Sequence, residues 1–144
     1  MTEALPGTVL ERGRVVPGAP LTDVRTGDRV SAWNLRGRRA VVIAFLHAGC
    51  SKCEAFLTDL EGHTEEIVTA GGQLMVVEDG SVTRWLGEGA ELPLLLVVDR
   101  DGAAWRSYPA AGHDFPDPAE VTATLWHLAT MCPECGVPTP EWLE

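Results

Sequence analysis

Three short apolar runs along the chain are typical of buried strands. The first is Ala40–Leu46, a continuous β-branched and aromatic stretch, and the others are 73–77 and Leu94–Val98. Continuous runs of this length indicate strands that are covered on both faces of a sheet. Residues 51–70, between the first two runs, carry apolar positions at helical spacing. The order strand, helix, strand predicts a right-handed crossover with two parallel strands.

Two main helices are expected. The first covers residues 51–70, where Gly62 is placed to kink or split it, and the second covers 118–131. Asp117 is suited to cap the second helix, and Pro118 is suited to its first position. The apolar residues that form the core faces of the two helices are Phe56, Leu57, Leu60, Ile67, Val68, Val121, Leu125, Leu128 and Ala129.

Antiparallel hairpins are expected before and after this central part. Two short alternating stretches at 20–24 and 29–33 flank a polar turn, which predicts an N-terminal hairpin. A short helical stretch at 81–86 precedes the third apolar run. After that run, a turn at 99–102 leads into a strand at 103–108, so pairing changes there from parallel to antiparallel.

The length of 144 residues, with 45% hydrophobic positions, is typical of one globular domain that buries a core without disulfides or metals. Within this single domain we distinguish three parts. Residues 1–39 form an N-terminal hairpin extension, residues 40–131 form the core, and residues 132–144 form a tail that contains cysteine.

The charge of the chain is strongly acidic. It carries 21 acidic and 11 basic residues, for a net charge of -10 at pH 7. Such a surface repels phosphate backbones and anionic lipid, so nucleic acid and membranes are not expected partners. The apolar runs are well below the roughly 20 residues that span a bilayer, and the first residues lack the basic-then-apolar order of a secretory signal. These features predict a cytoplasmic protein.

The four cysteines fall as two identically spaced pairs, Cys50 with Cys53 and Cys132 with Cys135. In a reducing compartment such pairs are redox or metal sites before they are structural disulfides. Cys50 begins the first expected helix, where backbone N–H groups and the helix dipole stabilise a thiolate, so it is the predicted nucleophile. Cys53 is placed to resolve the reaction by closing a disulfide. Lys52 adds positive charge that favours the thiolate.

Three segments together carry a family resemblance. They are Gly18-Ala19-Pro20 before the hairpin, the strand that leads into Cys50-Ser51-Lys52-Cys53, and Pro93 six residues before Asp99. The pattern resembles thioredoxin-fold proteins of the redoxin kind, which include thiol-disulfide oxidoreductases and peroxiredoxins. The resemblance implies an α/β thioredoxin-like three-layer fold, with a central mixed sheet, an N-terminal hairpin and flanking helices. It also implies that Pro93 follows a cis peptide bond and faces the dithiol, where it binds substrate; a trans proline that only opens the strand is the alternative.

Departures from the family's patterns bear on the chemistry. Gly49 replaces the tryptophan before thioredoxin's first cysteine, and Ser51-Lys52 replaces its Gly-Pro. His47 and Ile43 stand where peroxiredoxins have threonine and proline, which makes peroxide reduction the second choice. His47 either exchanges a proton with the nucleophile or pairs with its thiolate, or it is a loop histidine that caps the strand. No role is predicted for the other histidines, His63, His113 and His127.

Cys132 and Cys135 directly follow the last expected helix, at the negative end that disfavours a thiolate. A helix of about 14 residues carries its C-terminal end roughly 20 Å from the dithiol edge, so direct exchange between the pairs within one monomer is not expected. Three roles stay open. The pair fixes the tail structurally, forms half of a zinc site completed by a second chain, or acts as a second redox pair between subunits or with a partner.

The sequence therefore predicts a thiol-disulfide oxidoreductase in which Cys50 attacks a disulfide and Cys53 releases the product. One alternative is a peroxiredoxin-like hydroperoxide reductase with antioxidant activity. Another is a non-catalytic redoxin-like module whose cysteine pairs are structural or bind zinc. The expected partners are a disulfide-containing protein, or a small thiol or peroxide substrate, together with a reducing partner. The primary interpretation involves no cofactor and no bound metal, and it leaves the oligomeric state open.

Overall fold

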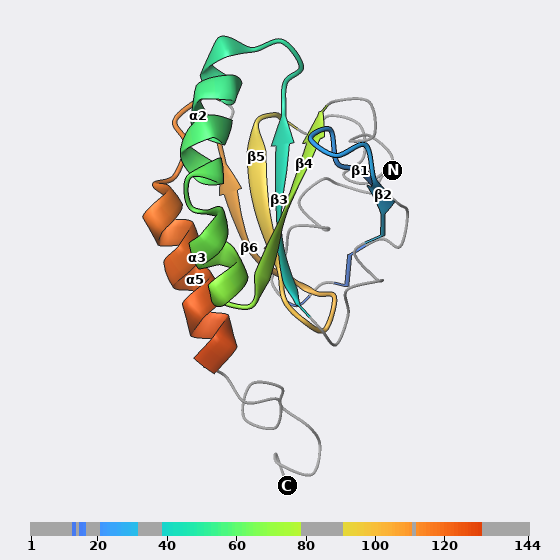
Figure 1. The fold of residues 1–144 in the computed structure, drawn as a ribbon, viewed down its shortest axis with the longest axis vertical. Helices are drawn as coiled ribbons and strands as arrows, with labels where there is room; N and C mark the ends of the chain where they lie inside the picture. The colour runs from blue at the N-terminus through green and yellow to red at the C-terminus, as the bar shows by residue number, and fades with distance from the viewer. Residues whose placement is uncertain are drawn as a thin grey trace, which may run out of the picture.

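The central strand of the sheet is β3 (Ala40–Leu46), and all of its residues are buried. It pairs in parallel with β4 (Gly72–Glu78) and antiparallel with β5 (Leu94–Val98). The latter pairs antiparallel with β6 (Ala104–Pro109), so the strand order is β4-β3-β5-β6 (Figure 1). The predicted change from parallel to antiparallel pairing is therefore confirmed.

The computed structural model describes residues 13, 15–16, 21–31, 39–78, 91–110 and 112–130. The predicted short helix at 81–86 and the tail at 132–144 lie outside these ranges, as do many residues of the N-terminal extension. No helix within the described ranges is long and apolar enough to cross a membrane.

The described helices are α2 (Ser51–Glu61), α3 (Thr64–Thr69) and α5 (Pro118–Thr130). The predicted break falls between α2 and α3 at Gly62, whose N–H group donates to the Thr58 carbonyl as α2 ends. Asp117 caps α5 as predicted, because its carboxylate accepts a hydrogen bond of 3.0 Å from the Ala119 N–H group.

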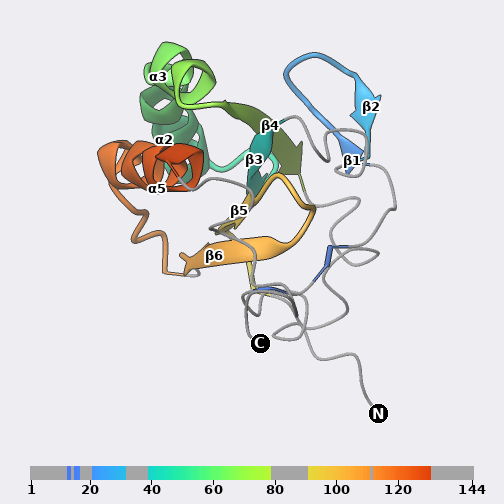
Figure 2. The same cartoon turned by 90° about the horizontal axis from the view of Figure 1, so that it is seen from below.

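The helices cover one face of the sheet, and the N-terminal hairpin lies on the other side (Figures 1 and 2). The hairpin consists of β1 (Leu21–Thr22) and β2 (Arg29–Val30), which pair antiparallel as predicted. Residues 20, 32 and 33 of the predicted stretches lie outside the described ranges. Alternate residues of β3 serve the two faces. Val42 belongs to the apolar cluster under the helices, and Ile43 belongs to the cluster on the hairpin side.

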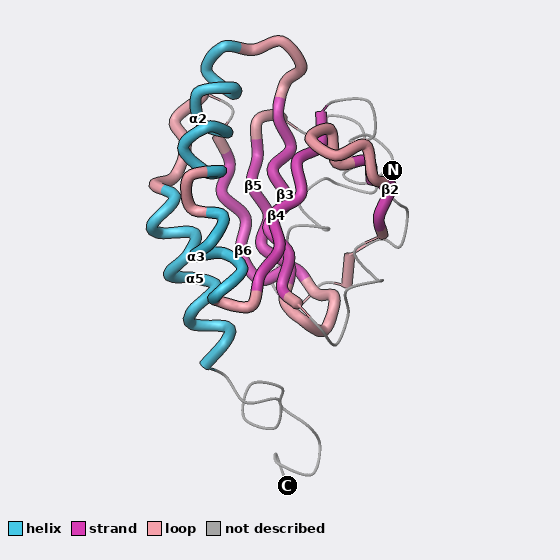
Figure 3. The backbone as a smooth tube through the Cα atoms, viewed as in Figure 1, coloured by secondary structure: helices cyan, strands magenta, loops and turns pink. Residues whose placement is uncertain are grey.

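Helices α2, α3 and α5 lie together beside the sheet (Figure 3), and α3 and α5 both approach β4 closely at Gly72. A Cβ atom at Gly72 of β4 would lie 2.9 Å from Leu125 Cδ1 and 3.3 Å from the Ile67 carbonyl oxygen, so this approach depends on glycine. Tyr108 of β6 and Thr124 of α5 share a buried hydrogen bond of 2.7 Å between their hydroxyl groups. These contacts fix α5, and the loop before it, relative to the sheet.

Two residues predicted for the helical core faces, Val68 and Ala129, are exposed instead. Helix α3 is only six residues long and buries only Ile67, so Val68 faces solvent. Ala129 and Thr130 are both exposed at the end of α5, because the last turn extends beyond the part of the helix that the core covers. Helical spacing predicted which face of each helix is buried, but not at which residue the burial of that face ends.

Candidate active site

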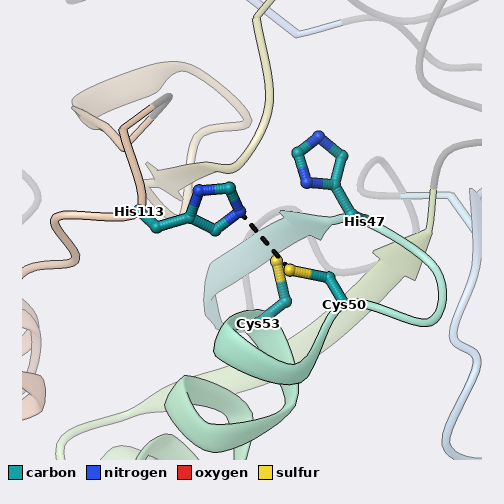
Figure 4. A group of neighbouring side chains, drawn as sticks. All are labelled: His47, Cys50, Cys53 and His113. Atoms are coloured by element: carbon teal, nitrogen blue, oxygen red, sulfur yellow. Dashed lines mark hydrogen bonds between the residues drawn. The ribbon is translucent and has the colours of Figure 1, made fainter.

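The turn after β3 places the first cysteine pair at one edge of the sheet (Figure 4). Gly49 has a φ of 69°, the left-handed conformation that favours glycine. Cys50 is then the N-cap residue of α2, and its carbonyl accepts the Glu54 N–H group at 2.9 Å. Cys53 lies in the first turn of α2, and both cysteines are free thiols.

The two thiols have opposite electrostatic environments. The pKa of Cys50 is lowered, chiefly because the backbone N–H of Cys53 hydrogen-bonds to its sulfur; partial desolvation opposes this, and the Cys53 side chain and the Lys52 charge assist it. Cys53 is only 1% exposed, and burial raises the pKa of its thiol, although a hydrogen bond from the His47 backbone acts in the other direction. The thiolate is therefore favoured on Cys50 and the thiol on Cys53.

His113 contacts Cys50 directly, although no role was predicted for it. Its Nε2 atom lies 3.4 Å from Cys50 Sγ, within hydrogen-bond distance for sulfur. The residue has a φ of 65° in the loop between β6 and α5. Its backbone N–H group donates to the Ala110 carbonyl at 2.7 Å, and the Ala110 N–H group donates to the Pro93 carbonyl at 3.0 Å. A neutral imidazole in this position can accept the thiol proton, and a protonated one can pair with the thiolate.

An aromatic contact holds the His113 loop against the helix that carries the cysteines. Phe115 stacks on Phe56 of α2 with ring centroids 4.3 Å apart and the planes nearly parallel. The His113 and Phe115 rings are nearly perpendicular, with their centroids 6.0 Å apart. Because Phe56 is buried in the core, this contact anchors the loop to a fixed part of the fold.

His47 lies beside His113, and both rings stand on the same side of the two sulfurs (Figure 4). The two imidazole centroids are 5.4 Å apart. One ligand atom from each of His47, Cys50, Cys53 and His113 lies within 4.8 Å of the others. The structure therefore places His47 beside the dithiol.

Of the other residues predicted for the site, the structure describes Lys52 and Pro93. Lys52 is exposed on α2. The Leu92-Pro93 peptide bond is cis, as the resemblance implied, and Pro93 is buried just before β5. Cys132 and Cys135 lie outside the described residues. The C-terminal end of α5, which precedes them, lies at the opposite end of the sheet from the β3–α2 turn (Figure 1).

The position of His113 beside the dithiol follows from the directions of the strands, although no local sequence motif indicates it. Strands β5 and β6 are each antiparallel to their neighbour, so β6 runs in the same direction as β3. The segments that follow β3 and β6 therefore meet at the same edge of the sheet. The predicted hairpin and the predicted position of Cys50 together place the segment that contains His113 at the same edge as the dithiol.

Comparisons with known proteins identify the fold. No protein-family model matches the chain, and no curated protein does. Among solved structures, it is similar to a 2-Cys peroxiredoxin of Plasmodium vivax in its reduced form, with a TM-score of 0.64, 9% identity, and coverage of 82% of this chain and 80% of that one. It is also similar to a secreted thiol-disulfide isomerase of Corynebacterium glutamicum, with a TM-score of 0.63 and 14% identity, over 79% of this chain and 84% of that one. A third similar structure is a thiol:disulfide interchange protein of Bacteroides sp., with a TM-score of 0.61 and 17% identity, over 88% of this chain and 95% of that one.

The chain therefore has the α/β thioredoxin-like fold that the sequence predicted: a mixed sheet with flanking helices and an N-terminal hairpin. The Cys50 and Cys53 dithiol stands at the start of the helix that follows the central strand. The cytoplasmic location stays a prediction, and one of the similar proteins is secreted.

Proposed function

We propose that the protein is a thiol-disulfide oxidoreductase with Cys50 as the nucleophile and Cys53 as the resolving thiol. The observation that supports this most strongly is the difference between the two sulfurs. Cys50 is half-buried with a lowered pKa and an imidazole nitrogen at 3.4 Å, whereas Cys53 is buried with a raised pKa. A two-step exchange requires one thiolate that attacks the substrate and a second thiol that reacts only after the mixed disulfide has formed.

The first step forms a mixed disulfide. The Cys50 thiolate attacks one sulfur of a substrate disulfide, a new S–S bond forms, and the substrate's S–S bond breaks. The leaving thiolate takes a proton, and His113, when protonated, is close enough to Cys50 to supply it. Lys52 and the backbone N–H of Cys53 stabilise the attacking thiolate before this step.

The second step closes the pair. Cys53 loses its proton, attacks the Cys50 sulfur, and releases the second substrate thiol while the Cys50–Cys53 disulfide forms. The substrate gains two electrons and two protons, and the pair loses them. A ring nitrogen of His47 lies within 4.8 Å of the sulfurs, from where it can accept the Cys53 proton through one bridging water. A reducing partner then restores the dithiol by the reverse exchange.

The resemblance to redoxin-like proteins supports Pro93 as a substrate-binding residue. Its carbonyl is occupied by the Ala110 N–H group, and Ala110 in turn holds His113. Pro93 and the residue that contacts the nucleophile are thus parts of one hydrogen-bonded segment at the dithiol edge. A disulfide-containing protein that lies along this edge is the expected substrate.

Peroxide reduction is the second candidate, because a 2-Cys peroxiredoxin is among the similar structures and an imidazole contacts the nucleophile. In this reaction the Cys50 thiolate attacks the peroxide O–O bond and becomes a sulfenic acid, with water or alcohol as the leaving group. Cys53 then displaces water from that sulfenic acid and forms the disulfide.

Two assays on the same reduced, metal-free protein separate these functions. We expect the wild-type protein to reduce insulin disulfides with dithiothreitol as the reductant and to consume hydrogen peroxide no faster than free dithiothreitol does. Cys50→Ser is expected to abolish insulin reduction, and the Cys132→Ser/Cys135→Ser double variant is expected to retain it. Rapid peroxide consumption that depends on Cys50 would favour the second candidate, and inactivity in both assays would contradict both.

A further inference from the structure

The side chains around the dithiol are of the types that ligate metal ions in proteins. Cys50 and Cys53 come from the first turn of α2, His47 from the end of β3, and His113 from the loop after β6 (Figure 4). Their ligand atoms all lie within 4.8 Å of one another. Within the described ranges, no other group of three or more histidine, cysteine and acidic residues converges in this way.

The distances are close to those of a tetrahedral site. Zinc bound at about 2.3 Å to sulfur and about 2.05 Å to nitrogen sets neighbouring ligand atoms about 3.4 to 3.8 Å apart. The 3.4 Å between Cys50 Sγ and His113 Nε2 already has this length. The remaining pairs are within 4.8 Å, so closure around an ion requires movements of about 1 Å, which side-chain rotation supplies.

The donor atoms select the kind of ion. Two thiolates and two imidazoles are the Cys₂His₂ set of tetrahedral zinc sites, whereas magnesium and calcium take oxygen ligands. Two thiolates also neutralise a divalent charge completely, so the complex carries no net charge beside the buried Cys53. The chain's overall charge of -10 attracts cations to the surface.

Supporting contacts hold the ligands in place before any ion binds. The His113 backbone is fixed by its hydrogen bond to the Ala110 carbonyl, and its loop is fixed by the Phe115 stack on Phe56. The two cysteines share one helical turn. A site assembled on such fixed elements loses little conformational entropy when it closes on an ion.

From this geometry we infer that the reduced protein binds one Zn²⁺ ion through Cys50, Cys53, His47 and His113. Binding displaces the two thiol protons to solvent, so each zinc ion taken up releases up to two protons. Oxidation by a disulfide-containing substrate removes both thiolates: the pair gives two electrons to the substrate disulfide, the Cys50–Cys53 bond forms, and the ion is released. Zinc binding and disulfide exchange therefore compete for the same two sulfurs.

The test uses cobalt as a spectroscopic probe and zinc as its competitor. Reduced Cys132→Ser/Cys135→Ser protein, in which the tail thiols are absent, is titrated anaerobically with Co²⁺ and then with Zn²⁺. We expect one equivalent of Co²⁺ to give the intense visible bands of tetrahedral cobalt together with sulfur-to-cobalt charge transfer, and one equivalent of Zn²⁺ to remove them. His113→Ala and His47→Ala are each expected to weaken zinc binding at least about tenfold, while His127→Ala leaves it unchanged.

Several results would overturn the inference: no binding, weak octahedral bands, or equal zinc affinity in all three histidine variants. Circular dichroism of each variant checks its fold, and a second measurement avoids mutations altogether. The same protein with the Cys50–Cys53 disulfide formed must not bind Co²⁺; binding by the oxidised form would contradict the assignment.

Zinc binding and disulfide exchange are measured independently. The same metal-free samples are assayed for insulin reduction. Exchange activity without zinc binding would refute only the metal site, and zinc binding without exchange activity would refute only the oxidoreductase function.

Discussion

Cys50 and Cys53 are identical thiols three positions apart, yet the fold gives their pKa values opposite shifts. The cause is local: Cys50 receives the free N–H groups of the first helical turn, and Cys53 points into the core beneath it. Deprotonation of Cys50 in the folded protein therefore takes place at lower pH than deprotonation of an ordinary cysteine. The reverse holds for Cys53.

The pH dependence of alkylation tests this difference. In the presence of a chelator, iodoacetamide should modify Cys50 with a midpoint below the ordinary thiol pKa of 9.0, and Cys53 much more slowly, because only the thiolate reacts. Peptide mass spectrometry after timed quenching measures both rates. In urea the two rates should converge, and equal rates in the folded protein would contradict the pKa assignment.

His113 is expected to influence the rate of exchange through its contact with Cys50. His113→Ala should lower the rate of insulin reduction by about 10²-fold, the lower part of the range for a lost general acid or base. His63→Ala is the matched control, since His63 lies at the start of α3 and contacts Glu66 rather than the cysteines. A rate in His113→Ala equal to that of this control would show that the contact is structural only.

The close packing of α5 against β4 depends on the glycine at position 72. Gly72→Ala should lower the free energy of unfolding by about 1–3 kcal/mol, because the new methyl group overpacks against Leu125 and the Ile67 carbonyl. Gly112→Ala is the control, since a Cβ there meets nothing within 4 Å. Urea denaturation measures both variants, and equal stability would show that α5 can shift without cost.

The elements also show what the sequence could predict. Uninterrupted apolar runs predicted β3 and β5, and Gly62 predicted the break between α2 and α3, because each of these is a local pattern. The His113 contact spans 63 positions, and nothing in the neighbouring sequence indicates it. Only the strand directions place that loop beside Cys50, so this part of the site required a three-dimensional argument.

Helix α5 runs from the dithiol edge toward the other end of the sheet (Figure 1). The chain that continues into Cys132 and Cys135 thus leaves the helix far from Cys50. We expect the Cys132→Ser/Cys135→Ser double variant to reduce insulin at no less than about half the wild-type rate, because no step of the exchange chemistry requires the tail. A loss of tenfold or more would show that the tail pair relays electrons.

In the proposed reaction, Cys50 attacks a disulfide and Cys53 resolves the product. The most direct test is to trap the intermediate by incubating reduced Cys53→Ser and Cys50→Ser variants, both in the tail-cysteine-free background, with a disulfide-bonded substrate. Non-reducing electrophoresis and mass spectrometry then measure the covalent adducts. We expect a stable mixed disulfide on Cys50 in Cys53→Ser and almost none in Cys50→Ser. Equal adducts in both variants, or none in Cys53→Ser, would contradict it.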